Sequence, residues 1–142
     1  MDLIEADLSE ARLWGANLQG ARLGRVNLRG ANLAAADLSG AHLGRADLLQ
    51  AHLIGASLRT ASLVGANLEN AYLTAADLHE AFLGEANLQG THLHAARNLT
   101  CAQLSQAETL QGATLPDGAV LPDDYTWRER FEAWCAALEG GG

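Results

Sequence analysis

The residues of this chain that are best suited to chemistry are its histidines and cysteines. They are His42, His52, His79, His92, His94, Cys101 and Cys135. Imidazole and thiolate are typical zinc ligands, and a zinc site needs three or four such ligands around one ion. His92 and His94 are close in sequence, but no third ligand accompanies them. Nothing in the sequence requires the two cysteines to pair, so we expect a reduced chain in which Cys101 is a small buried side chain. We predict no metal site and no cofactor.

The sequence also lacks the patterns of a catalytic site. No nucleophile, base and orienting residue occur at a recognisable spacing. No glycine-rich pattern follows a strand and opens a helix, as a phosphate-binding loop does. We therefore predict that the protein is not an enzyme.

The composition fits one domain with a thin, regular core. The chain has 142 residues, of which 49% are hydrophobic but only 5% aromatic, so few large rings are available to fill a globular interior. Its formal net charge is −8, with nine arginines and no lysine, which disfavours general binding to a phosphate backbone. The sequence shows neither a secretion signal nor a run of about eighteen apolar residues. We expect a cytoplasmic protein that binds neither nucleic acid directly nor a membrane.

Leucine occupies every fifth position from Leu3 to Leu93, nineteen times in succession. On an α-helix each step of five residues turns by about 140°, which would scatter the leucines around the axis. On a flat strand an odd period sends successive leucines to opposite faces. Each five-residue unit must therefore make the same turn and point its leucine into one shared interior, as in a solenoid.

Three further positions repeat with the leucine. Alanine lies two residues before it, with Val26 and Thr91 as the only departures after Met1, so we expect a small side chain to pack inward there. Glycine is frequent two residues after the leucine, which suits a turn with unusual backbone angles. Asp or Asn precedes the leucine in alternate repeats and can accept hydrogen bonds from the turn backbone.

This motif resembles that of the pentapeptide-repeat family over residues 1–96. The resemblance implies an all-β solenoid, a right-handed quadrilateral parallel β-helix with four repeats per coil and with leucine and alanine inside. Neighbouring coils would stack about 4.8 Å apart, like strands. His52 and His92 would then lie on one wall but about 10 Å apart, which is too far for one ion.

Four repeats per coil would stack residues that are twenty apart on one wall of the prism. We define the Leu13 wall as the wall that carries Leu13, Leu33, Leu53, Leu73 and Leu93. Its candidate partner-binding residues are Arg12, Trp14, Asn32, His52, Ile54, Tyr72 and His92. One explanation of this mixture is that exposed positions on the wall tolerate many residue types. The other is a surface for a protein partner or for self-association, because exposed Trp and Ile on a wall with one formal charge are unusual unless they are covered.

The ladder ends after Leu93, since Leu99 arrives one place late. We expect residues 97–121 to form an irregular terminal coil with a short helix, for which Thr100 and Gln103 supply a capping-box pattern.

Residues 122–139 are predicted to form a C-terminal amphipathic helix, followed by a flexible tail at 140–142. The apolar stripe of this helix is Trp127, Phe131, Trp134 and Leu138, at spacings typical of one helix face. The stripe could cap the open end of the solenoid core or form a homodimer contact.

Met1 lies directly in the ladder, which would leave the first coil with an open edge. This predicts a fragment of a longer chain, an assembly paired through that edge, or an engineered chain.

The sequence favours a non-enzymatic structural or protein-interaction module with an unknown partner. The alternative comes from the resemblance, because one branch of the pentapeptide-repeat family imitates duplex DNA and protects type II topoisomerases such as DNA gyrase. Residues 1–93 hold ten acids and six arginines, a net charge of −4, so this ladder is only weakly anionic for such a role.

Overall fold

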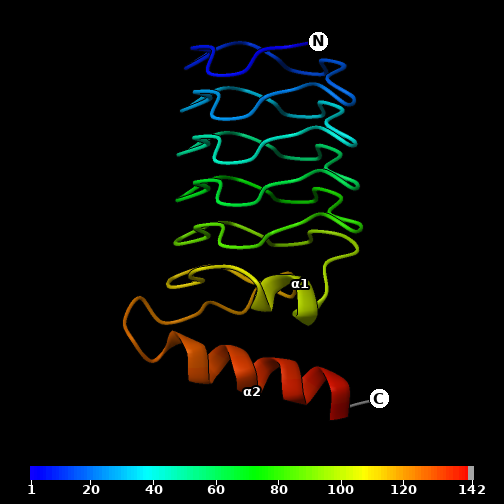
Figure 1. Ribbon diagram of the computed structural model, residues 1–142. Helices are drawn as coiled ribbons and strands as arrows, with labels where there is room; N and C mark the ends of the chain where they lie inside the picture. The colour runs from blue at the N-terminus through cyan, green and yellow to red at the C-terminus, as the bar shows by residue number, and fades with distance from the viewer. Residues whose placement is uncertain (141–142) are drawn as a thin grey trace.

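The computed structural model describes residues 1–140 and shows the chain wound into a stack of similar coils (Figure 1). Parallel β-bridges join residues that are twenty apart, from Asp2 with Arg22 to Asp77 with Arg97. This period places four five-residue repeats in each coil, as the family resemblance implies. Two helices follow the ladder, α1 (Cys101–Ser105) and α2 (Trp127–Gly140).

The backbone of each repeat is hydrogen-bonded to the coils on either side of it. In the repeat around Leu33, the amides of Asn32, Leu33 and Ala35 donate to carbonyls of neighbouring coils. The Ala36 amide closes the turn onto the Leu33 carbonyl at 3.0 Å. The remaining amide, that of Ala34, donates to Asn32 Oδ1 at 3.1 Å. An Asp or Asn before the leucine therefore pairs the last free N–H of the repeat, which explains why the sequence prefers these residues there.

The residue two places after each leucine has a positive φ throughout the ladder. Seven of these residues are glycine, and twelve are larger residues such as Thr60, whose φ is 59°. Glycine adopts this region at little steric cost, whereas a residue with a Cβ is strained there. The frequency of glycine at this position thus follows from the turn geometry, as the sequence indicates.

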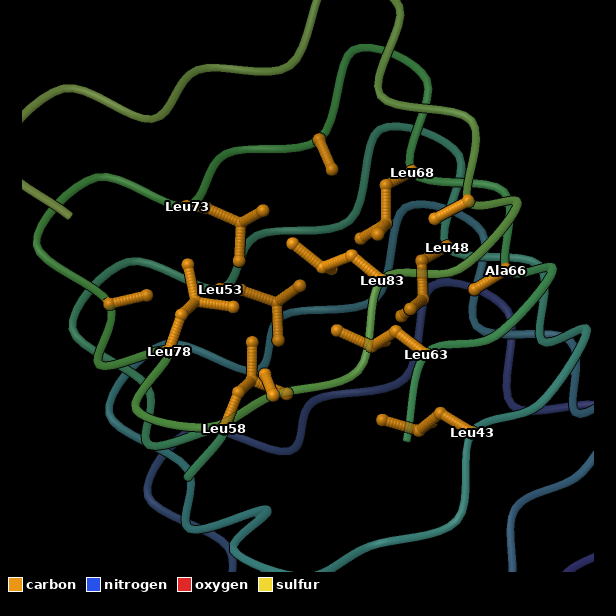
Figure 2. Packing of buried hydrophobic residues seen from close by; sticks show 14 of the residues in the cluster. Leu43, Leu48, Leu53, Leu58, Leu63, Ala66, Leu68, Leu73, Leu78 and Leu83 are labelled. Carbon is orange, nitrogen blue, oxygen red and sulfur yellow. The ribbon is translucent and has the colours of Figure 1, made fainter. Parts of the chain in front are cut away.

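The leucines fill the interior of the prism (Figure 2). From Leu23 to Leu93 each leucine of the ladder is at most 3% exposed. The small residues two places earlier are also buried, and where Thr91 replaces alanine its Oγ1 donates to the Leu68 carbonyl at 2.7 Å. The hydroxyl is thereby satisfied inside the core. Leu3 is only partly buried because it lies at the end of the stack.

The register changes after Arg97, where the sequence predicts the end of the ladder. Asn87 pairs with Thr109, two residues further along the chain than the regular period of twenty would place its partner. Helix α1 occupies this insertion. The predicted capping box is present, because Thr100 Oγ1 accepts from the Gln103 amide at 3.1 Å and Gln103 Oε1 accepts from the Thr100 amide at 2.9 Å.

An irregular partial coil separates α1 from α2. Leu110, Leu115 and Leu121 join the core cluster there, and Gly118 donates to the Leu115 carbonyl at 2.8 Å to close a turn. These leucines extend the apolar interior beyond the last regular coil.

Helix α2 lies across the end of the stack (Figure 1). Trp127 and Phe131 are 8% and 4% exposed and belong to the same buried cluster as the leucines. Helix α2 begins at Trp127, five residues later than the predicted start at 122, and ends at Gly140, one residue beyond the predicted end. Residues 141–142, the rest of the predicted tail, lie outside the described residues.

Candidate functional site

The histidines do not form a metal site within residues 1–140. No group of three or more His, Cys, Asp and Glu side chains in this part of the chain could hold an ion. His52 and His92 share a wall, as expected, but Tyr72 lies between them.

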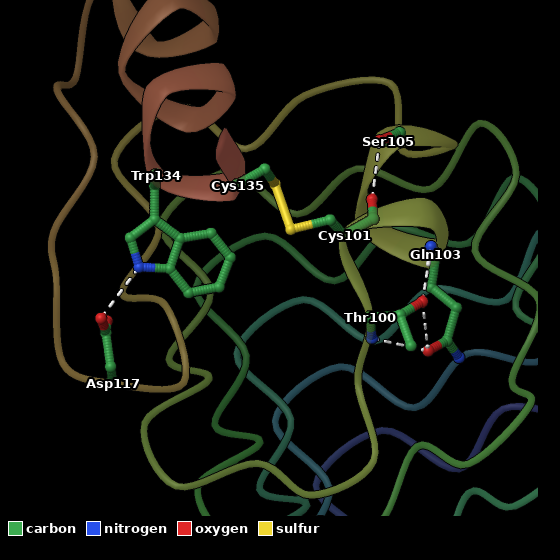
Figure 3. The surroundings of a disulfide bond; sticks show 7 residues. All are labelled: Thr100, Cys101, Gln103, Ser105, Asp117, Trp134 and Cys135. Carbon is green, nitrogen blue, oxygen red and sulfur yellow. Dashed lines mark hydrogen bonds between the residues drawn. A yellow bond between two sulfur atoms is a disulfide. The ribbon is translucent and has the colours of Figure 1, made fainter. Parts of the chain in front are cut away.

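The two cysteines form a disulfide, contrary to the prediction from sequence (Figure 3). Cys101 begins α1 and Cys135 lies in α2, and their Cα atoms are 6.0 Å apart, within the usual range for a disulfide. The expectation of a reduced chain with Cys101 as a free buried side chain is therefore wrong. The pairing depends on the path of the chain between the two helices, which returns α2 to α1 and leaves no local signal in the sequence.

The structure brings all seven candidate residues of the Leu13 wall onto one side of the prism. Consecutive β-bridges align Arg12, Asn32, His52, Tyr72 and His92 in one column. The other two candidate residues lie in the second column of the same wall, two coils apart with Ala34 between them. Both are exposed, Trp14 to 71% and Ile54 to 45%.

Three rings of this wall form a continuous stack. The His52 and Tyr72 rings are 4.9 Å apart with planes inclined by 9°, and the Tyr72 and His92 rings are 4.8 Å apart with planes inclined by 7°. The spacing of the rings matches the spacing of the coils, so each ring covers the face of the next. The stack therefore offers ring edges to a partner and leaves no gap for another ring to enter.

A hollow of about 540 Å³ opens beside His92 at one end of the Leu13 wall. Glu69 and Asp123 lie on its lining together with Leu121. The lining is largely polar, with two carboxylates, Asn70 and Gln89 beside the apolar Val120 and Leu121. Of the residues predicted from sequence, His92 alone contributes to it. The terminal coil after α1 forms part of this hollow, so the repeat pattern alone could not predict it.

Apolar side chains are also exposed on the wall that carries Leu3, Leu23, Leu43, Leu63 and Leu83, which we call the Leu3 wall. Phe82 is 59% exposed, and Ile4 and Val64 are each 43% exposed. The sequence prediction did not single out these residues, although grouping residues that are twenty apart, as for the Leu13 wall, would have identified them. They are spread among the arginines Arg22, Arg25 and Arg45.

The walls between these two hold carboxylates that are bound by their own turns. Hydrogen bonds from the side chain and the backbone of Ser39 lower the pKa of Asp37, and those of Ser9 do the same for Asp7. These acids are consequently ionised at neutral pH and already occupied by local donors.

The predicted stripe of α2 divides into buried and exposed parts. Trp127 and Phe131 are buried, Trp134 packs partly against the core, and Leu138 is 54% exposed. Trp134 Nε1 donates to Asp117 Oδ2 at 2.9 Å (Figure 3), and this hydrogen bond lowers the pKa of Asp117. The first three residues thus face the end of the solenoid, and Leu138 does not. Within residues 1–140, no helix has both the length and the apolar character to cross a bilayer.

Parallel coils of four five-residue repeats, with leucine and alanine inside, define a β-solenoid. Pentapeptide repeats match the sequence in eight copies, over residues 6–44, 31–70, 51–90 and 71–108. The chain therefore belongs to the pentapeptide-repeat family. A comparison with curated proteins finds no match.

Solved pentapeptide-repeat proteins resemble the chain in structure. One from the cyanobacterium Cyanothece 51142 is 43% identical over 61% of this chain and 58% of its own, with a TM-score of 0.60. One from the thylakoid lumen of Arabidopsis thaliana is 27% identical over 75% of this chain and 72% of its own, with a TM-score of 0.62. QnrB1, a plasmid-mediated fluoroquinolone resistance protein, is 18% identical over 95% of this chain and 65% of its own, with a TM-score of 0.53. The last similarity shows the fold alone.

Proposed function

We propose that this protein is a non-enzymatic protein-interaction module and that its Leu13 wall binds a partner protein. The observation that carries the proposal is the exposure of Trp14 and Ile54 on the wall that also carries the ring stack and only one formal charge. Tryptophan and tyrosine are enriched at the energetic centres of protein interfaces, and charged residues are depleted there. Each stacked ring restricts its neighbour, so little side-chain freedom would be lost on binding.

The hollow beside His92 supports a particular chemistry for the partner. Glu69 and Asp123 lie at its lining, so a partner that inserts an arginine or lysine there would meet opposite charge and polar neighbours. The proposed partner therefore presents an apolar patch with a cationic side chain at one end.

The test is a pair of matched double variants. Trp14→Ser with Ile54→Ser changes the Leu13 wall, and Val64→Ser with Phe82→Ser removes similar exposed apolar area from the Leu3 wall. We expect only the first pair to weaken the partner interaction by tenfold or more, about 1.4 kcal/mol. Partners would be cross-linked to the native protein, purified, and titrated against both variants. Equal affinity for the native protein and the Leu13-wall variant, with unchanged oligomeric mass, would refute the proposal.

We propose that α2 caps the solenoid rather than forming a homodimer through its apolar stripe. We also propose that the coils wind in the right-handed sense of the family. Burial of Trp127 and Phe131 within one chain supports the cap, because these side chains have little surface left for a second copy. Light scattering of the Trp127→Ala/Phe131→Ala variant separates the two roles. A cap predicts loss of folded structure, and a dimer contact predicts a halved mass with the fold retained.

The second candidate function is protection of a type II topoisomerase. It rests on the family resemblance and on the net charge of −8, of which residues 1–93 carry −4. The similarity to QnrB1, at 18% identity, adds the fold alone. Against it, Arg59 and Arg29 lie within ion-pair distance of Asp77 and Asp47, which reduces the negative charge of the walls. A supercoiling assay in which excess protein leaves gyrase activity and its fluoroquinolone inhibition unchanged would exclude this function.

Cytoplasmic localisation stays a prediction. The disulfide is more typical of an oxidising compartment. Fractionation with alkylation of free thiols measures both the location and the redox state of Cys101 and Cys135.

A further inference from the structure

We propose that the Cys101–Cys135 disulfide is a thiol-exchange site. A dithiol reductant opens it, and this opening releases α2 from the end of the solenoid. The proposal concerns the C-terminal end of the protein and does not rest on the Leu13 wall having a partner.

The disulfide is one of few attachments between α2 and the rest of the chain. Trp127 and Phe131 bury the first half of α2 against the core. In the second half, the Trp134 hydrogen bond to Asp117 and the disulfide hold the helix (Figure 3). The salt bridges found within residues 1–140 all lie in the ladder, and none joins α2 to another element. Reduction therefore removes the only covalent link between α2 and the solenoid other than the chain itself.

The disulfide lies beside a hollow at the protein surface. Cys101 and Cys135 are both partly exposed, and both line a surface hollow of about 310 Å³. The same hollow is bordered by the small residues Ala102, Ser105 and Ala136 and by the larger Phe131, Glu132 and Glu139. A thiolate can approach the disulfide from this side.

The exchange balances with a dithiol as the electron donor. One thiolate of the reductant attacks a sulfur of the disulfide, the bond between Cys101 and Cys135 breaks, and the other cysteine leaves as a thiolate. The second thiolate of the reductant then attacks the mixed disulfide. The reductant leaves as its own disulfide, and two electrons and two protons convert both cysteines to thiols.

The effect of reduction is confined to the C-terminal end because of where the two cysteines lie. Cys101 belongs to α1, which is inserted where the regular register ends, and Cys135 belongs to α2. The coil-to-coil hydrogen bonds of the ladder involve neither residue. An isolated helix as short as α2 is marginal in water, so its order depends on being held against the core. Release of the link exposes Trp127 and Phe131 together with the last leucines of the core.

Hydrogen exchange on the full chain, with and without dithiothreitol, tests this inference. We expect the amides of α2 to exchange about tenfold faster or more after reduction, while the amides between Leu23 and Leu88 keep their protection. Reoxidation should restore protection of α2. Unchanged exchange in α2 would overturn the proposal. Equal loss of protection in the ladder would overturn the claim that the effect of reduction is confined to the C-terminal end.

Two variants make the test independent of the reductant. Cys101→Ser/Cys135→Ser should show fast exchange in α2 with or without dithiothreitol. In a Trp14→Phe background, fluorescence reports only Trp127 and Trp134, and reduction should shift the emission to longer wavelength as Trp127 becomes exposed. A double serine variant with α2 as protected as in the oxidised protein would contradict the role of the disulfide.

Discussion

Arg59 Nη1 donates to Asp77 Oδ2 at 2.9 Å, and the Asp77 side chain is only 9% exposed. Burial raises the pKa of this carboxyl, but hydrogen bonds from Asn98, Arg59 and the His79 amide outweigh it and lower the pKa from 3.8 to about 2. The ionised carboxylate of Asp77 thus links Arg59 of one neighbouring coil to Asn98, the residue that follows the last regular β-bridge at Arg97.

Acid should therefore weaken the fold through Asp77. A carboxyl whose pKa is lower in the folded state stabilises the protein fully above the unfolded pKa of 3.8 and loses this contribution as the pH falls toward about 2. We expect about 1–2 kcal/mol of the free energy of unfolding to disappear between pH 5 and pH 2 for this reason. Urea unfolding of the native protein and Asp77→Asn over this range measures it, and the variant should show the smaller loss.

Asp47→Asn is the matched control for this measurement. Asp47 also precedes a leucine and faces an arginine, Arg29, but its side chain is 34% exposed and the separation is 3.5 Å. Its removal should change the acid dependence less than removal of Asp77. An equal effect of both variants would show that general charge repulsion, and not the Asp77 network, causes the acid sensitivity.

Thr60→Gly should stabilise the protein. Thr60 has a φ of 59°, which costs a residue with a Cβ about 1–2 kcal/mol, partly offset by the greater chain entropy of glycine. We expect a net gain of about 0.5–1 kcal/mol in thermal or urea unfolding. The converse variant Gly55→Thr should lose a similar amount, because Gly55 has a φ of 69° and a Cβ there would meet no atom within 4 Å. A loss of stability in Thr60→Gly would contradict this account.

Leu58→Ala should destabilise the protein by about 2–5 kcal/mol, because it leaves a cavity between two stacked coils. Leu58 is fully buried. Leu3→Ala is the matched control at the end of the stack, where the leucine is only partly buried, and should cost clearly less. Urea unfolding of both variants measures the difference, and equal costs would mean that the stacking of coils does not determine the contribution of each leucine.

The ladder could be predicted from sequence because each repeat solves the same local problem. Leu33 must point inward, Ala36 must be small, and the residue two places after the leucine must tolerate a positive φ. Periodicity alone therefore determines the register. The capping box of Thr100 and Gln103 is also local, and it was predicted correctly.

The disulfide and the hollow beside His92 could not be predicted in this way. Both depend on the irregular path after Arg97, where the repeat no longer specifies which residues meet. The same applies to Asn98, whose Nδ2 donates a hydrogen bond to Asp77 Oδ1 at 2.9 Å. The ring stack of the Leu13 wall is intermediate, since the column could be read from the sequence but the near-parallel rings could not.

Tyr72→Ala should show how far the ring stack stabilises the Leu13 wall. Tyr72 stacks on His52 and on His92, and each aromatic contact is worth about 0.5–1.5 kcal/mol. We expect Tyr72→Ala to lower the free energy of unfolding by about 1–3 kcal/mol and Tyr72→Phe, which keeps the ring, by less than about 0.5 kcal/mol. Phe82→Ala is the control on the Leu3 wall, where the ring is 59% exposed, and should cost less than Tyr72→Ala. Equal losses in the free energy of unfolding for Tyr72→Ala and Phe82→Ala would show that stacking stabilises the protein no more than the partial burial of a single ring does.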